Sequence, residues 1–198
     1  MTPMRRSCAE RSDEELLAQA GSQPDALEAL YRRHVGKTLA FALRRCSTPE
    51  EAHDLVAAVW LDVIDSAARF DPAKGRAVPW LFGIAVNLVA DKRRRWARER
   101  EALQRLGGHR VLDEDAIERL ESALDATSLT PTLLVALENL PTAERVAFEL
   151  VALEGLSAPE AGEALGLDAA AVRMRLTRAR QKLRRAIPEP YEEEVRRS

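Results

Sequence analysis

The part of the sequence best suited to bind a polyanion is a run of arginine and lysine near its end. Between Ala169 and Ile187 the chain holds seven cations and, after Asp168, no carboxylate. Apolar residues recur among these cations at helical spacing, at Val172, Leu176, Ala179 and Leu183. Such a helix can pack by its apolar stripe and turn its cations toward phosphates. The alternative is a merely solvated cationic face, which is common in arginine-rich helices.

The residues before this segment make it the second helix of a helix-turn-helix. Ser157 and Glu160 have the spacing of a capping box that opens a short helix. Gly166 ends that helix after Leu165, and Asp168 caps the basic helix that follows. A short helix, a three-residue turn and a longer basic helix predict a helix-turn-helix, whose second helix enters the major groove of DNA.

A second cationic segment lies in the middle of the chain, in a helix predicted over about 78–106. It begins with the apolar run VPWLFGIAVNLVA, and residues 91–100 then hold six cations against two carboxylates. A buried root and a cationic tip are typical of a helix whose far end meets nucleic acid, although a solvated tail is the alternative. Pro72 and Gly75 predict a loop over residues 70–77, just before this helix.

Apolar residues at helical spacing predict helices along most of the chain, and long valine- or isoleucine-rich strand patterns are missing. We therefore expect an all-α protein of two small helical domains, a four-helix bundle and a helix-turn-helix domain. Carboxylates dominate residues 111–127 and predict an acidic linker between them. The expected boundaries are 1–106 for the first domain, 107–129 for the linker, 130–187 for the second domain and 188–198 for a tail. The further helices are predicted over about 13–20, 24–45, 49–68, 131–139 and 143–154.

Composition limits the kind of function. The 198 residues carry a net charge of −2, so the chain is not a general polyanion binder, and its local basic segments carry the information. Cys8 and Cys46 make no disulfide framework, and His34, Cys46 and His53 match no common zinc site. We expect no metal and no cofactor. The absence of a long apolar run or an apolar signal core predicts a cytoplasmic protein without membrane insertion.

Four segments, taken together, resemble one protein family. They are LYRRHVGKTLAFALRR, PEEAHDLVAAVWLDV, RFDPAKGRAVPWLFGIAVNLVADKRRR and LPTAERVAFELVALEGLSAPEAGEALGLDAAAVRMRLTRARQKLR. Residues 28–97 resemble region 2 of bacterial sigma-70-type factors, and residues 131–187 resemble region 4. The small size and the absence of a middle domain resemble the extracytoplasmic-function (ECF) class. The resemblance implies a subunit that directs RNA polymerase to promoters and promotes DNA opening.

The resemblance also implies contacts with the core polymerase. In the family, the helix matching AHDLVAAVWLDV docks on a coiled coil of the largest polymerase subunit, and the flap region is a further contact. The matching positions are Asp54, Leu55, Val59 and Trp60. Ala57 and Ala58 stand where the family usually has a glutamine and an acidic residue. For Leu55, Val56 and Val59, internal packing is the alternative.

The family loop matching residues 70–77 captures an unstacked base of the −10 element, and the helix after it holds the neighbouring single strand. Strand separation without ATP needs such contacts, because pocket and phosphate interactions must offset the loss of stacking. The −10 candidates are Lys74, Arg76, Trp80, Asn87, Asp91, Arg93 and Arg94. For Trp80 core packing is the alternative, and this alternative is stronger still for Phe82.

In region 4 the resemblance implies that the helix over 169–187 reads the −35 element. Arg173, Met174 and Arg178 are the candidates for base edges, while the candidates for other DNA contacts, chiefly with phosphate, are Arg175, Arg180 and Lys182. Met174 stands where many relatives have a small hydroxyl residue. Its contact would then be apolar, for example with a thymine methyl, or lost.

The sequence therefore predicts an ECF-type sigma factor with no catalysis of its own. Its expected partners are core RNA polymerase, promoter DNA and an anti-sigma factor. One alternative is a stand-alone helix-turn-helix transcriptional regulator, which leaves the first domain without a purpose. Another is a nucleic-acid enzyme, for which Asp62 and Asp65 are the nearest carboxylate pair but no metal triad is visible.

Overall fold

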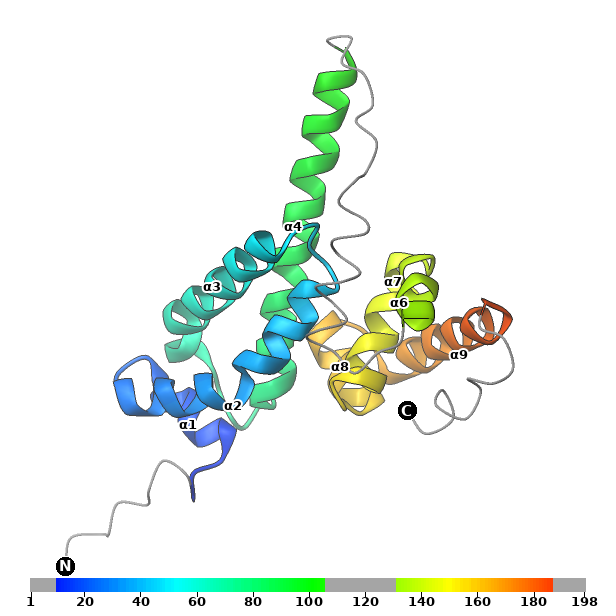
Figure 1. Ribbon diagram of the computed structural model, residues 1–198. Coiled ribbons are helices and arrows are strands. Elements are labelled where there is room, and N and C mark those ends of the chain that lie inside the picture. Colours follow the sequence, from blue (N-terminus) through cyan, green and yellow to red (C-terminus); the bar gives the residue numbers. More distant parts are fainter. Residues whose placement is uncertain (1–9, 106–130, 187–198) are drawn as a thin grey trace, which may run out of the picture.

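The computed structural model describes residues 10–105 and 131–186, and these residues are helical with short connections (Figure 1). No strand occurs within the two described stretches, which confirms the all-α prediction. We call the helices of the first stretch the N-terminal bundle and those of the second the C-terminal bundle. The N-terminal bundle consists of α1 (Asp13–Ala20), α2 (Pro24–Leu43), α3 (Pro49–Ser66), the 3-10 turn η2 (Ala67–Arg69) and α4 (Ala77–Arg105).

The C-terminal bundle ends in the predicted helix-turn-helix. Its elements are α6 (Pro131–Glu138), α7 (Thr142–Phe148), the π-helical turn η3 (Glu149–Leu153), α8 (Ala158–Leu165) and α9 (Ala169–Ala186). The predicted linker at 107–129 and tail at 188–198 lie outside the described residues, as does Cys8. The proposed domain boundaries stay predictions.

Side-chain caps fix the start of several helices. The Glu15 amide donates to the Ser12 hydroxyl over 3.1 Å, and the Ser12 amide donates back to the Glu15 carboxylate over 2.9 Å. Ser157 and Glu160 repeat this capping box at the start of α8. At α3 the Thr48 hydroxyl accepts the Glu51 amide. The Glu51 carboxylate accepts the amide of Ser47 over 3.0 Å, not that of Thr48, so this cap is not a full capping box.

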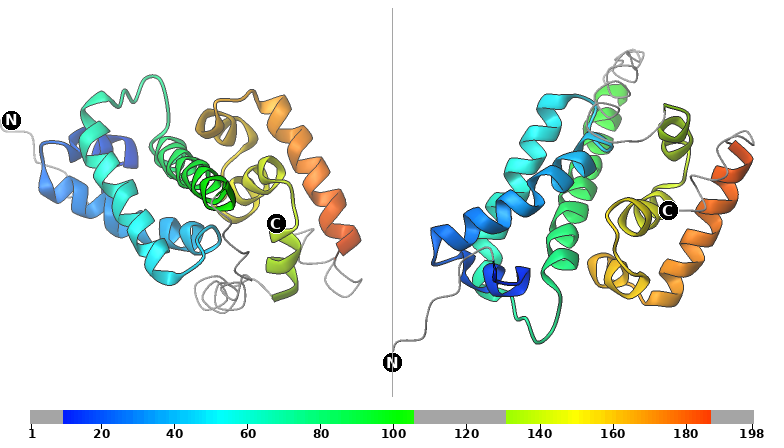
Figure 2. Two further views of the ribbon diagram at one scale, coloured as in Figure 1. Left: turned by 90° about the horizontal axis from the view of Figure 1, so that it is seen from above. Right: turned by 60° about the horizontal axis from the view of Figure 1, so that its bottom comes forward.

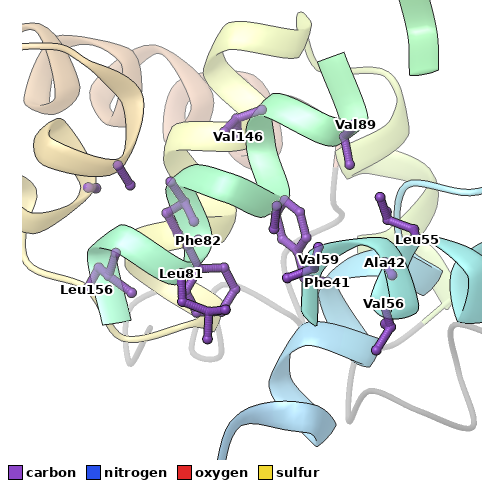
Figure 3. Close-up of a cluster of buried hydrophobic side chains, with 14 of the residues drawn as sticks. Phe41, Ala42, Leu55, Val56, Val59, Leu81, Phe82, Val89, Val146 and Leu156 are labelled. Atoms are coloured by element: carbon purple, nitrogen blue, oxygen red, sulfur yellow. The ribbon is translucent and has the colours of Figure 1, made fainter. Parts of the chain in front are cut away.

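Helix α4 is the centre of the packing, because it contacts α3 of its own bundle and α8 of the other. The fully buried rings of Phe41 on α2 and Phe82 on α4 meet edge to face with centroids 5.7 Å apart, which confirms Phe82 as a core residue. Figure 3 shows this cluster continuing to Val146 and Leu156, which belong to the C-terminal bundle. The buried apolar residues thus form one cluster that spans both bundles.

The turn of the helix-turn-helix depends on two glycines. Gly166 ends α8 in the left-handed conformation, with φ 63°, and the Asp168 carboxylate caps α9 by accepting the Ala171 amide over 2.6 Å. A Cβ at Gly162 would lie 2.6 Å from the carbonyl oxygen of Leu167, so this position requires glycine. The predicted apolar stripe of α9 is buried, as expected, at Val172, Leu176, Ala179 and Leu183.

One helix differs from the prediction in its geometry. The sequence predicts a single helix over about 143–154, but α7 ends at Phe148 and the chain continues as a π-helical turn. In this turn the Glu154 amide donates to the Glu149 carbonyl over 3.0 Å. Helical periodicity does not distinguish this wider turn from an α-helix over so few residues.

Candidate nucleic-acid and polymerase interfaces

Helix α9 presents its candidate base contacts to solvent. Arg173, Met174 and Arg178 are exposed, and Met174 remains 54% accessible. The opposite stripe of the helix packs inside the C-terminal bundle, so the exposed face is free to enter the major groove of DNA. The base-edge roles of these three residues stay predictions.

The remaining candidates of α9 lie beside this exposed face. Arg175 and Arg180 are half-buried, which suits a contact with phosphate at the groove edge better than a reach to the bases. Lys182 is exposed but pairs with Glu144 over 2.7 Å. Its ammonium group must leave that carboxylate, or share it, to contact DNA.

The loop before α4 is short and closed by its own side chains. The Asp71 carboxylate accepts the Ala73 amide over 3.0 Å and pairs with the exposed Lys74 ammonium over 2.9 Å. These hydrogen bonds, from Lys74 first, hold the pKa of Asp71 below its ordinary value. Lys74 thus projects into solvent from a defined turn.

Arg76, at the end of the same loop, is held by carboxylates from two other helices. Its guanidinium donates to Glu14 of α1 over 3.0 Å and lies 3.5 Å from Glu160 of α8. Its amide donates to Glu163 of α8 over 3.2 Å. The hydrogen bond that Arg76 donates to Glu14, with the negative charges of Glu14, Glu160 and Glu163, raises the pKa of Arg76. The loop therefore joins the two bundles.

The candidates along α4 are in three different situations. Asn87 is exposed, and Asp91 and Arg94 are exposed but pair with each other over 2.5 Å. The Arg93 guanidinium crosses to the C-terminal bundle and donates to the Thr142 hydroxyl over 2.9 Å. Trp80 is half-buried against the edge of Phe70, with ring centroids 5.7 Å apart, so its ring both packs and meets solvent.

The four polymerase-contact candidates on α3 differ in their exposure. Leu55, Val59 and Trp60 are buried in the N-terminal bundle, and the Trp60 indole donates to the Thr38 hydroxyl over 3.4 Å. The burial of Leu55 and Val59 fits the alternative that these residues pack internally. Asp54 is exposed.

The exposed face of α3 carries two large apolar residues, Leu61 and Ile64, that are not among the predicted polymerase contacts. Leu61 is 62% accessible, and Ile64 and Ala57 are also exposed on this helix. Together with Asp54 they recur three and four positions apart, so they share one side of the helix. The spacing of these residues is visible in the sequence as a second helical stripe, but the longer apolar stripe that is buried on the same helix is the stronger pattern. We call Asp54, Ala57, Leu61 and Ile64 the outer face of α3.

The groups considered as metal ligands do not come together. Among residues 10–105 and 131–186, no cluster of His, Cys, Asp and Glu could hold a metal ion. Cys46 is buried, and burial raises the pKa of its thiol to about 11. The His34 ring pairs instead with Asp13 over 2.8 Å. Within the same described stretches, no helix combines the length and apolarity that a membrane crossing requires.

Comparisons with known proteins agree with this arrangement. The models of Sigma-70 region 2 and of Sigma-70, region 4 match residues 30–99 and 132–183. The RNA polymerase sigma factor CarQ of Myxococcus xanthus is 35% identical over 167 residues, which cover 83% of this chain and 91% of CarQ. The chain belongs to the sigma-70 family.

Other relatives place this sigma factor in the ECF class. The ECF RNA polymerase sigma factor SigE of Mycolicibacterium smegmatis is 33% identical over 157 residues, 79% of this chain and 60% of SigE. The solved structure of CnrH in complex with the cytosolic domain of CnrY superposes with a TM-score of 0.62 at 31% identity. That match covers 87% of this sigma factor and 95% of CnrH. The predicted family and class are confirmed.

Proposed function

We propose that this sigma factor binds core RNA polymerase, recognises the −10 and −35 elements of promoters and promotes DNA opening without catalysis of its own. Its place of action is then that of the polymerase, the cytoplasm. The observation that carries the proposal is the tandem of regions 2 and 4 in one chain, with an exposed cationic recognition helix in region 4. A stand-alone regulator needs only the second of these regions.

In this proposal α9 reads the −35 element. Arg173 and Arg178 supply donors for the O6 and N7 acceptors of guanine, and Met174 supplies an apolar contact that fits a thymine methyl group. Arg175, Arg180 and, once released from Glu144, Lys182 hold the phosphates. The exposed residues Arg173, Met174 and Arg178 are thus assigned to the bases, and the half-buried Arg175 and Arg180 to phosphates.

The −10 element falls to the loop and to α4. Lys74 and Arg76 lie in the loop, and Trp80, with its half-exposed ring, offers a stacking surface for an unpaired base. Asn87 and Asp91 line α4 as hydrogen-bonding groups, while Arg93 and Arg94 neutralise phosphates. Fixed contacts of this kind offset the free energy lost when bases unstack.

The outer face of α3 is the proposed docking site for the coiled coil of the largest polymerase subunit. Its exposed leucine and isoleucine are unusual on a surface helix and suit an apolar anchor bordered by a polar residue, Asp54. The contact with the flap region falls to the C-terminal bundle, where Val135 of α6 is a large exposed apolar side chain. An anti-sigma factor is a further partner of this sigma factor, in line with the structure of CnrH bound to CnrY.

Run-off transcription tests the proposal directly. Purified protein, core polymerase and genomic promoter fragments should give specific transcripts that are absent without the protein. Leu61→Arg should weaken the binding of core polymerase at least tenfold, because it places a charge in an apolar anchor. Ala18→Arg, at an exposed position of α1, is the matched control. Tight duplex binding with no polymerase dependence and no transcripts would establish the stand-alone regulator instead.

A further inference from the structure

The part of α9 that points straight away from the C-terminal bundle carries no charge. Its residues are Ala170, Met174 and Thr177, and all three are exposed. They recur four and three positions apart, so they follow one line along a helix of about 3.6 residues per turn. We call Ala170, Met174 and Thr177 the central line of α9.

The buried stripe of α9 shows which way the central line points. Its residues, which pack inside the C-terminal bundle, are Val172, Leu176, Ala179 and Leu183. At about 100° per residue, the middle of the central line lies roughly 160° around the helix from the middle of this stripe. In both views of Figure 2, α9 lies at an edge of the molecule, with the rest of its bundle on one side. The central line is therefore the part of α9 that enters deepest into a DNA groove.

The arginines border the central line and do not lie on it. Arg173 is about 60° to one side of Ala170, and Arg178 is about 80° to the other. Arg175 and Arg180 lie further around the helix and are half-buried. A helix that enters the groove in this orientation places apolar groups against the middle of the site and guanidiniums on both of its sides.

The hydroxyl of Thr177 is already bonded within the helix. It donates to the carbonyl oxygen of Arg173 over 3.0 Å. This hydrogen bond fixes the side-chain rotamer and leaves the γ-methyl as the group that Thr177 offers to a base. Together, the central line presents the methyl groups of Ala170 and Thr177 and the thioether of Met174.

These groups favour one base over the others. Of the four bases, only thymine carries a methyl group on its major-groove edge, and alanine and the threonine methyl are known to contact it. The other edges present hydrogen-bond donors and acceptors there. An apolar line would leave these donors and acceptors desolvated and without partners, which costs binding free energy.

We propose that the central line contacts thymine methyl groups in the −35 element, with Thr177 as a specificity-determining residue beside Ala170 and Met174. This inference rests on the proposed function for the role of α9, and it adds the base that the middle of the helix reads. From Ala170 to Thr177 the helix rises by about 10 Å, the length of about three base-pair steps. The −35 element therefore contains thymine, on either strand, within a stretch of about three or four base pairs.

Replacing thymine by deoxyuridine tests the proposal at a single methyl group, because deoxyuridine pairs like thymine but lacks that methyl. The starting duplex is a promoter fragment that gives run-off transcripts, with its −35 element randomised. Binding by the full chain in complex with core polymerase selects the preferred elements. Each thymine of the selected element is then replaced in turn, and competition binding measures the affinity. At least one replacement should weaken binding about fourfold, the value of one buried methyl group.

Two substitutions assign this loss to Thr177. Thr177→Ser keeps the hydroxyl and removes the methyl, whereas Thr177→Val keeps a methyl and removes the hydroxyl. The deoxyuridine effect at one thymine should vanish in Thr177→Ser and persist in Thr177→Val. Thr132→Ser, the same change at an exposed position of α6, is the matched control and should leave the effect unchanged.

The results separate this proposal from the proposed function. A selected element without thymine, or one on which no replacement changes the affinity, would overturn the proposal while promoter recognition stands. A deoxyuridine effect that is the same in Thr177→Ser as in the wild type would also overturn it. If no fragment gave transcripts, or no −35 sequence were preferred, the role of α9 in promoter recognition would be refuted, and this proposal with it.

Discussion

The two DNA-contacting regions that the sequence predicts differ in what surrounds their cations. On α9 the base-reading arginines project into solvent from a helix that is anchored by its own apolar stripe. In the loop and α4, Arg76 and Arg93 are engaged by side chains of the C-terminal bundle. The base-edge candidates of α9 thus face solvent, whereas Arg76 and Arg93, although also exposed, already have polar partners in the C-terminal bundle.

The largest effect on stability is expected from removing the buried charge of Glu149. Glu149→Gln leaves the guanidiniums of Arg45 and Arg145 without their carboxylate in a buried site, and we expect a loss of about 3–5 kcal/mol in the free energy of unfolding. Urea denaturation measures it. Glu138→Gln, at an exposed position of α6, is the control and should change the free energy by less than about 0.5 kcal/mol. Similar values for both variants would mean that these ion pairs do not hold this part of the molecule.

Acid should weaken the ion pairs of Glu149 in the same way. Burial raises the pKa of Glu149, but the charges of Arg45, Arg145 and Arg44 outweigh burial and hold that pKa below its ordinary value of 4.5. Its contribution to stability is therefore fully present above pH 4.5 and lost as the pH falls through the lowered pKa. Burial raises the pKa of Glu154, which gives a change of opposite sign.

The Glu149 contribution is isolated by comparing urea denaturation of the wild type and Glu149→Gln between pH 6 and pH 3. The difference between the two proteins should shrink as the pH falls. A difference that stays constant over this range would assign the effect of the substitution to lost packing rather than to charge.

Two arginines of α9, the exposed Arg173 and the half-buried Arg180, should differ in their effect on DNA binding. Arg173→Ala should relax the choice of base at one −35 position by about 1–3 kcal/mol, because Arg173 is exposed on the reading face. Arg180→Ala should instead weaken all −35 sequences alike and lower the slope of log K against log salt for duplex binding by about 0.9. Competition binding with a library of −35 sequences distinguishes them. Equal loss of discrimination in both variants would remove the division into base and phosphate contacts.

A smaller effect is expected for Arg93. Its guanidinium is exposed, so Arg93→Ala should lower the slope of log K against log salt for single-strand binding by about 0.7, the share of one phosphate contact. Fluorescence titration of a single-stranded 20-mer of random sequence at several salt concentrations measures this slope. An unchanged slope would remove Arg93 from the proposed −10 contacts.

The smallest effect is expected for Lys74. Its pairing with Asp71 is exposed to solvent, so Lys74→Ala should change the free energy of unfolding by less than about 0.5 kcal/mol. In run-off transcription the same variant should lower the use of promoters without changing affinity for core polymerase. Reduced binding of core polymerase would count against a role for the loop in −10 recognition.

Local sequence patterns predict most of the helices, several of their caps and the two faces of α9. These features depend on residues within a few positions of one another, such as Ser157 with Glu160 or the stripe from Val172 to Leu183, and local patterns record them. The family resemblance followed from the same local segments. For α3 the pattern predicted a helix but not which of its two apolar stripes faces outward.

The pairing of charged groups between the two bundles depends on the tertiary structure. The pairs of Arg45 with Glu149 and of Arg76 with Glu160 join residues that are far apart in the chain, so no local pattern indicates them. The π-helical turn and the close contact of Gly83 on α4 with Ala164 on α8 likewise depend on the packing of one bundle against the other. Free energy from local hydrogen bonds and periodic burial shapes each helix, but the state of its cations depends on the partner that the fold brings to them.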